Sequence, residues 1–223
     1  LVVCTPDQRS TFCDAEEHPE NETTEVCNGL DDDCDGEVDE DVDDMVDFGT
    51  FRMYRNEASR IDATRHNVGT SFARACSQPG VMPWSDVTWQ EAADACAAAG
   101  LRLCTQEEWE LVCMGGQDYL YPYGDVYDGT LCNGQDYFVD PGQGEPIDKA
   151  IPTGDAAQCL SVDGVSDLSG NLWEWMADDL GEGNHPFKGG GFANIPEGLT
   201  CTYTNASEGG ALYSIGFRCC GDL

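Results

Sequence analysis

Thirteen cysteines in a chain of 223 residues constrain its fold more than any other feature of the sequence. None of them forms a Cys-x-x-Cys pair, and no two histidines are paired in the manner of a zinc site. We therefore expect a framework of disulfides, which persists in oxidising compartments and is rare in the cytosol. The pattern predicts an exported protein, secreted or at the cell surface, whose signal segment has been removed or lies outside this sequence.

The chain is strongly negative, with 43 acidic residues against 10 basic ones and a formal net charge of -33. This charge disfavours nucleic acid and anionic membrane as partners, and favours cations and basic surfaces. No apolar run is long enough to span a membrane, so we expect no direct membrane insertion. A solvated acidic surface suited to a saline habitat is the alternative explanation of the charge.

The composition changes near Asp47. Residues 1–47 are acidic, contain four cysteines and have few large apolar side chains, so they cannot form an ordinary core. From Phe48 onward, aromatic residues, glycine and alanine become frequent. We expect a small N-terminal module at residues 1–47, organised by disulfides and calcium, and a main domain at residues 48–223.

An EF-hand-like loop lies in the N-terminal segment. Asp31, Asp33 and Asp35 occupy alternate positions, and Gly36 follows at the sixth position. Carboxylates at this spacing converge on one ion, and the glycine permits a sharp turn, which is an arrangement that calcium prefers. The loop therefore predicts a calcium site; an unstructured acidic tail is the alternative.

The second half of this loop departs from the EF-hand pattern. Val42 stands at the twelfth position, where a bidentate glutamate is expected. The carbonyl of Glu37 is the next expected ligand, and Asp39 or Glu40 must complete the shell unless the affinity is weak. The Cys-Asn-Gly-x-Asp-Asp-Asp-Cys-Asp-Gly pattern resembles short MopE-type metal-binding motifs of secreted bacterial proteins, which implies a bacterial surface protein.

Two capping boxes predict two short helices in the main domain. Thr88-Trp-Gln-Glu91 begins a helix that Gly100 ends, and Thr105-Gln-Glu-Glu108 begins a second that Gly115 ends. Each helix directs one cysteine toward the core. The rest of the domain indicates long loops with glycine, proline and aspartate, and a closing strand over residues 212–219.

Three sequence blocks identify a likeness to a known family. They are Asp167-Leu-Ser-Gly-Asn-Leu-Trp-Glu-Trp175, Lys188-Gly-Gly-Gly-Phe192 and Gly216-Phe-Arg-Cys-Cys220. In that order and spacing they resemble the formylglycine-generating enzyme (sulfatase-modifying factor) family. The resemblance implies an α+β, C-type-lectin-like fold with long irregular loops, few short helices and short strands.

The same resemblance implies two structural disulfides, Cys96 with Cys219 and Cys113 with Cys201. Between the helices and beside Cys219, two further cysteines suggest a third bridge, Cys104 with Cys220. In the loop region we expect Cys132 to pair with Cys159. Cys76 is unassigned, and the odd total leaves one thiol, which we expect to be buried and inert rather than a link between chains.

Calcium is also what the resemblance implies for the aromatic loop. By position, Asp167 and Glu174 would donate carboxylate oxygens, Gly170 and Leu172 would donate carbonyl oxygens, and Asn171 would support the turn. A second family calcium site corresponds to Asn133 and Gly134, and more loosely to Glu145 and Ile147. These ions would hold loops together and perform no chemistry.

The family's known oxidase chemistry finds no support in the sequence. Its members convert a substrate cysteine to formylglycine with copper held by two thiolates, five and ten residues before the cysteine that matches Cys201. The stretch from Lys188 to Thr200 contains no cysteine, and copper(I) requires soft ligands. The histidines show no spacing typical of an iron centre, so we assign no catalytic residue.

We therefore expect a non-catalytic binding or structural protein on a degenerate scaffold of this family. Its partner would be a protein or carbohydrate at the cell surface, or further copies of the same chain. Tyrosines between Tyr119 and Tyr127 are candidates for part of a binding face, although some of them are expected in the core. The alternatives are a metal-dependent oxidase with an unrecognised centre and a subunit of a calcium-dependent surface polymer.

Overall fold

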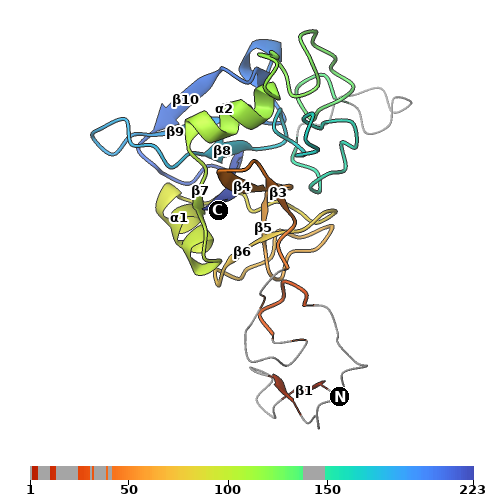
Figure 1. Cartoon of the computed structure of the whole chain (residues 1–223), viewed down its shortest axis with the longest axis vertical. Coiled ribbons are helices and arrows are strands. Elements are labelled where there is room, and N and C mark those ends of the chain that lie inside the picture. Colours follow the sequence, from red (N-terminus) through yellow and green to blue (C-terminus); the bar gives the residue numbers. More distant parts are fainter. Residues whose placement is uncertain are drawn as a thin grey trace. The chain divides into compact units, whose positions relative to one another are not determined.

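The computed structural model describes residues 2–4, 11–13, 25–30, 32, 39, 42–137 and 149–223. The chain divides into two compact units, Leu1–Asp43 and Asp44–Leu223. In the first unit, β1 (Val2–Cys4) and β2 (Thr11–Cys13) form an antiparallel pair (Figure 1). The sequence placed the boundary near Asp47, whereas residues 45–47 form a strand of the second unit.

In its described residues the second unit combines two α-helices and one short 3-10 helix with short strands, so the expected α+β class is confirmed. Its helical elements are α1 (Trp89–Ala98), α2 (Gln106–Met114) and the 3-10 helix η1 (Pro196–Leu199). Its strands are β3 (Met45–Asp47), β4 (Phe51–Tyr54), β5 (Ala58–Arg60), β6 (Ala75–Ser77), β7 (Arg102–Leu103), β8 (Trp173–Trp175), β9 (His185–Lys188), β10 (Thr204–Ser207), β11 (Ile215–Phe217) and β12 (Cys219–Asp222).

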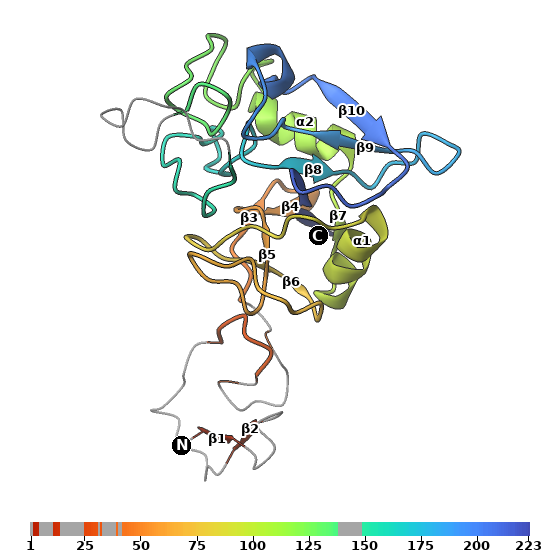
Figure 2. The same ribbon diagram turned by 180° about the vertical axis from the view of Figure 1, so that it is seen from behind.

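Two four-stranded sheets organise this unit (Figures 1 and 2). In one sheet the order is β3-β4-β12-β7, so the C-terminal strand lies between strands that are distant in sequence. In the other the order is β10-β9-β8-β11, and β11 pairs in parallel with β8. Strands β5 and β6 form a separate antiparallel pair. Most of the strands are only three or four residues long, and long loops connect many of them.

Both helices begin as their capping boxes predict. The Thr88 hydroxyl accepts a hydrogen bond from the Glu91 backbone N–H, and the Glu91 carboxylate accepts one from the Thr88 backbone. The same reciprocal pair joins Thr105 and Glu108 at the start of α2. Gly115 ends α2 with a left-handed φ of 58°, which costs glycine no steric penalty.

The core of the second unit contains two large clusters and a smaller third one around Cys132 and Cys159. The first lies beneath α1 and includes the fully buried Trp84, Trp175 and Phe217. The second lies beneath α2 and includes Met53 and Trp109. Burial of such large side chains stabilises by about 1.5–3 kcal/mol each before the entropic cost of ordering them.

The predicted disulfide pairs are all present. Cys96 bonds to Cys219, Cys104 to Cys220, Cys113 to Cys201, and Cys132 to Cys159. The first three tie the C-terminal part of the chain to the segments that contain α1 and α2, across sequence separations of 123, 116 and 88 residues. Disulfides that close such long loops restrict the unfolded chain strongly.

The remaining cysteines with described side chains, Cys27 and Cys76, are disulfide-bonded too. The thiol left over by the odd total therefore lies outside the residues whose side chains are described. So many disulfides are typical of extracellular proteins. No helix within the described ranges has the length and apolar character needed to cross a membrane.

The closing strand differs from the prediction of one strand over residues 212–219. The structure has two strands, β11 and β12, separated by Arg218, and Leu212 and Tyr213 are exposed in the preceding loop. The chain passes here from one sheet to the other, because β11 pairs with β8 whereas β12 pairs with β4 and β7. The side chain of Arg218, at the crossing, is fully buried and bonded to groups of other segments.

Candidate functional site

The loop that precedes β8 is tightly built and approaches the loop at Asn133. A β-carbon on Gly170 would lie 2.4 Å from the backbone oxygen of Asn133, and the Gly170 φ of 81° is itself left-handed. Only glycine fits such a position without a shift of backbone. The Asn171 backbone N–H donates to the same Asn133 carbonyl at 2.8 Å. The structure thus brings two of the predicted calcium segments side by side.

Asn171 supports this junction with its side chain. Its amide oxygen accepts from the Ile151 backbone N–H at 2.9 Å and from the Asn133 amide at 3.0 Å. Its amide nitrogen donates to Glu57, and the other Glu57 oxygen accepts from the Leu172 backbone N–H at 3.0 Å. The predicted supporting position of Asn171 matches these contacts, whereas Glu57 was not singled out by the sequence.

Glu174 forms a buried ion pair with Arg218. The Arg218 Nη2 lies 2.9 Å from Glu174 Oε1, and the two side chains are 0% and 1% exposed. The Trp109 indole N–H donates to Glu174 Oε2 at 2.8 Å. The remaining guanidinium donors reach backbone carbonyls, including that of Tyr54 at 2.8 Å. Both oxygens of the predicted calcium ligand Glu174 therefore already have partners.

Asp167 is the other carboxylate of the predicted set, and it has one unused oxygen. Its Oδ2 accepts from the Gly154 backbone N–H at 2.6 Å, whereas Oδ1 is buried without a hydrogen-bond partner. Burial raises the pKa of the Asp167 carboxyl to about 6. Burial, followed by the charges of Asp167 and Glu174, also raises the pKa of Glu57 well above its ordinary value.

Buried acidic groups and unpartnered oxygens occur together in this part of the chain. Three buried carboxylates, those of Glu57, Asp167 and Glu174, interact with the single guanidinium of Arg218. The side-chain oxygen of Asn133, on the adjoining loop, is also buried and without a partner. Oxygen donors of this kind suit calcium rather than a soft metal. Among the described residues, no three His, Cys, Asp or Glu side chains are grouped closely enough to hold a metal by themselves.

Of the remaining predicted ligands in this region, Gly134 packs close to Leu199, and a β-carbon on it would meet the leucine at 2.4 Å. Leu172 is buried directly before β8, and its backbone N–H donates a hydrogen bond to the Glu57 carboxylate. Glu145 and Ile147 lie outside the described residues.

The N-terminal loop is described only in part. Asp39 is buried, and its carboxylate accepts from the backbone N–H groups of Asn28 at 2.7 Å and Gly29 at 2.9 Å. Glu25, which the sequence did not indicate, accepts from the backbone of Asp32 and of Asp39. The other predicted ligands lie outside the described residues: Asp31, Asp33, Asp35, Glu37 and Glu40.

The stretch before Cys201 is the one in which the sequence resemblance implies the family's thiols. Ten and five positions before Cys201 stand Gly191 and Pro196. Pro196 opens η1, and its carbonyl accepts from the Tyr121 hydroxyl at 3.2 Å. The Gly191 backbone N–H donates to the Asn194 side chain at 2.8 Å. This stretch is therefore a well-packed turn that offers no sulfur ligand.

Two pairs of aromatic rings involve residues in or near that stretch of the sequence. Trp173 contacts Tyr203 with a ring separation of 5.9 Å, and Phe192 contacts Tyr213 at the same separation. Tyr203 and Tyr213 are exposed, as is Ile195. Of the tyrosines that the sequence indicated, Tyr121 is buried, in line with the expectation that part of that set lies in the core.

Comparison with known proteins relates the chain to one family. The family described as "Sulfatase-modifying factor enzyme 1-like domain" matches residues 33–223. The "Inactive C-alpha-formylglycine-generating enzyme 2" of Mus musculus is 29% identical over 150 residues, covering 62% of this chain and 48% of the relative. The "Formylglycine-generating enzyme" of Mus musculus is 33% identical over 112 residues, covering 43% of this chain and 27% of the relative.

The chain thus spans at most about half the length of these relatives. Among solved structures, PvdO from Pseudomonas aeruginosa superposes with a TM-score of 0.58 at 16% identity, covering 78% of this chain and 80% of that one. This likeness bears on the fold alone, and it confirms the C-type-lectin-like architecture that the sequence blocks implied.

Proposed function

Because the chain belongs to the sulfatase-modifying factor family, we propose that it is a non-catalytic member that binds or assembles outside the cell. One observation carries the proposal: every cysteine with a described side chain is in a disulfide, and Gly191 and Pro196 stand where the family's copper thiolates are expected. A disulfide sulfur is neither a thiolate ligand nor a nucleophile. The match to a mammalian relative named inactive is consistent with this proposal.

Copper does not fit the residues present. Copper(I) requires thiolate, thioether or imidazole donors, and the stretch from Lys188 to Thr200 supplies carbonyl, amide, hydroxyl, carboxylate and ammonium groups only. We therefore derive no oxidation step for this chain.

Calcium is the ion we propose instead, in a structural role. The unpartnered oxygens of Asp167 and Asn133 support it, because a buried carboxylate oxygen without a donor is costly unless a cation or a proton compensates it. Glu174 would act indirectly, through its ion pair with Arg218, rather than as the direct ligand that the family pattern implies. For the N-terminal loop, the alternation of Asp31, Asp33 and Asp35 is the argument for a second calcium ion.

Metal analysis of the purified protein tests both parts of this proposal. We expect calcium, with neither copper nor iron in stoichiometric amount, and a fall in melting temperature when a chelator removes the calcium. Stoichiometric copper or iron in the native protein would overturn the non-catalytic assignment. Retention of full thermal stability in the chelator, with no calcium bound, would overturn the structural role of calcium.

A further inference from the structure

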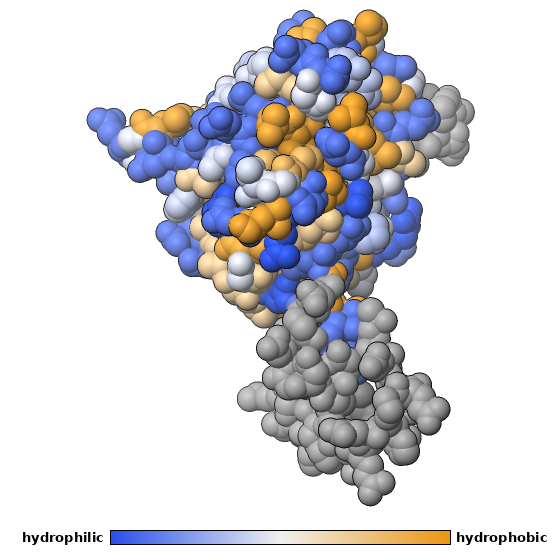
Figure 3. All heavy atoms as spheres, viewed as in Figure 1, coloured by the Kyte–Doolittle hydropathy of each residue, from blue (hydrophilic) through white to orange (hydrophobic). Residues whose placement is uncertain are grey.

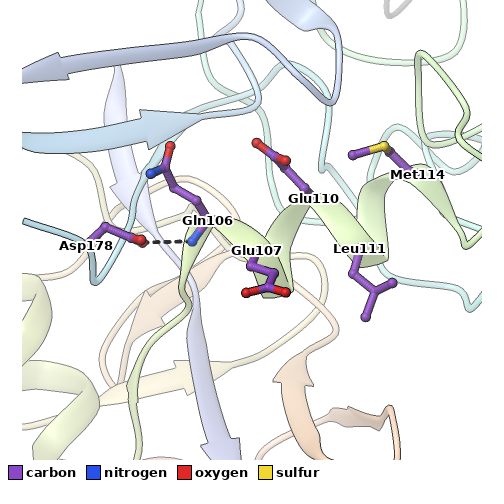
Figure 4. Close-up of a pocket in the computed structure, with 6 residues that line it drawn as sticks. All are labelled: Gln106, Glu107, Glu110, Leu111, Met114 and Asp178. Carbon is purple, nitrogen blue, oxygen red and sulfur yellow. Dashed lines mark hydrogen bonds between the residues drawn. The ribbon is translucent and has the colours of Figure 1, made fainter. Parts of the chain in front are cut away.

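The helix α2 has a buried face and an outward face that differ in chemistry. Trp109, Val112 and Cys113 are directed into the core. The outward residues repeat at helical spacing and line an open hollow of about 490 Å³, which Asp178 borders at one end (Figure 4). The helical residues that line it are Gln106, Glu107, Glu110, Leu111 and Met114. Hydrophobic surface lies over α2, bordered by hydrophilic side chains (Figure 3).

The hollow carries an excess of negative charge. The negative charge of Glu110 is compensated by Lys188, whose side chain is fully buried. The Lys188 ammonium lies 2.7 Å from Glu110 Oε1. Glu107 and Asp178 have no basic partner in an ion pair within the described part of the chain. Asp178 instead accepts from the Gln106 backbone N–H at 2.8 Å, which fixes it at the start of α2 (Figure 4).

Apolar side chains follow these charges toward the C-terminal end of α2 (Figure 4). Leu111 is 51% exposed near the middle of α2, and the half-buried Met114 lies one turn further along. A methionine adapts its shape to varied partners. A leucine and a methionine that adjoin carboxylates can receive an apolar side chain while the neighbouring charges remain hydrated or paired.

We propose that this hollow is the docking site for a basic segment of another protein. An apolar side chain of the partner would pack on Leu111 and Met114, while lysine or arginine neighbours would approach Glu107 and Asp178. The hollow is open and only six residues line it, so it admits a few side chains of a partner rather than a whole domain. Charge complementarity of this kind speeds association and selects partners.

The charge of the chain also decides against a second copy as the occupant. Each copy carries a formal net charge of -33, so two copies repel each other. A basic segment removes that repulsion and gains from the excess of carboxylates over ammonium groups at the hollow.

A binding experiment on the whole protein tests this inference. The probe is a short fluorescently labelled peptide of lysines with a leucine among them, and the readout is anisotropy at low and at physiological salt. Glu107→Lys is expected to weaken binding by about tenfold or more, and Leu111→Ser by about fivefold to tenfold. Asp163→Lys changes an exposed acid elsewhere by the same charge and is expected to alter binding by less than about twofold.

Three outcomes would contradict the docking site. The first is equal weakening by Asp163→Lys and Glu107→Lys, which would mean that only net charge attracts the peptide. The second is equal binding of a peptide with serine in place of leucine, or equal binding of spermidine, because the apolar contact would then have no role. The third is no binding to the native protein. Unchanged melting temperatures of the variants establish that each is folded.

This inference deepens the proposed non-catalytic function by naming a partner class, and the two can fail separately. Loss of peptide binding leaves the metal analysis unaffected, and copper in the purified protein leaves the peptide result unaffected.

Discussion

Arg218 and Glu174 form a fully buried ion pair, with Arg218 Nη2 2.9 Å from Glu174 Oε1. The pair joins β8 to the residue between β11 and β12, and Trp109 of α2 adds a hydrogen bond to the same carboxylate. Three segments that are distant in sequence therefore depend on one charged contact. Removal of either residue would leave the other as a buried charge without a counterion.

The change Arg218→Met leaves Glu174 buried without a counterion. We expect the free energy of unfolding to fall by about 3–5 kcal/mol, because a lone buried charge is strongly destabilising. Denaturant-induced unfolding measures the loss. The control is Arg65→Met, which breaks an exposed pair with Asp155 and should cost less than about 1 kcal/mol. A loss for Arg218→Met no larger than for Arg65→Met would contradict the assignment.

The buried Asp167 predicts an unusual dependence of stability on pH. Its ordinary pKa of 3.8 is raised in the folded protein to about 6, so between these values the folded state binds more protons than the unfolded state. In a chelator, the free energy of unfolding should therefore fall as pH rises from about 4 to about 6. The raised pKa of Glu57 contributes with the same sign.

The change Asp167→Asn removes the ionisable group of that residue. Asparagine tolerates the left-handed φ of 59° and can still accept from the Gly154 N–H. We expect a flatter pH profile and, at neutral pH in a chelator, a gain of up to about 3 kcal/mol. An unchanged profile, measured by urea unfolding from pH 4 upward, would show that Asp167 is not the titrating group.

Calcium bound at Asp167 should offset the loss of stability that ionisation of this buried carboxyl causes in a chelator. Added calcium is expected to raise the melting temperature of the native protein at neutral pH, because a ligand that binds only the folded state stabilises it. Asp167→Asn should reduce the response, whereas Asp163→Asn, at an exposed acid, should leave it intact. An identical calcium response in native protein and Asp167→Asn would place the ion elsewhere, such as in the N-terminal loop.

The disulfides should differ in how much each adds to the free energy of unfolding, according to the length of the loop that it closes. Replacing both Cys113 and Cys201 with alanine opens a link of separation 88, and replacing Cys132 and Cys159 opens one of separation 27. The chain-entropy relation predicts a loss of about 3–5 kcal/mol for each, larger by about 1 kcal/mol for the longer loop. Thermal unfolding of the two variants checks the order. A greater loss at the shorter loop would indicate that local packing, rather than loop entropy, dominates.

Local signals in the sequence predict local structure well here. The capping boxes at Thr88 and Thr105 place both helix starts, because each is complete within four residues. The disulfide pairs came from the family resemblance and from position, and all four are present. The prediction of a single closing strand was wrong, because β11 and β12 pair in different sheets and Arg218 separates them.

The charge network of the site lay beyond sequence reasoning. Glu57 and Asn171 are separated by 114 residues, and Glu174 and Arg218 by 44. No local pattern reports such contacts, since they depend on how the sheets bring the segments together. The family pattern marked Glu174 as a metal ligand, but it carried no information about which cation, guanidinium or metal, would neutralise it.

We propose that this chain retains the scaffold of its family without the copper chemistry. The most direct test measures oxygen uptake by the native protein supplied with copper(I) and a cysteine-containing substrate peptide. As a comparison, Gly191→Cys combined with Pro196→Cys restores thiols at the two positions before Cys201, and we expect that variant to retain copper(I). The native protein should retain no copper(I) after desalting and consume no oxygen above the buffer rate. Stoichiometric copper retention with peptide-dependent oxygen uptake by the native protein would contradict the account.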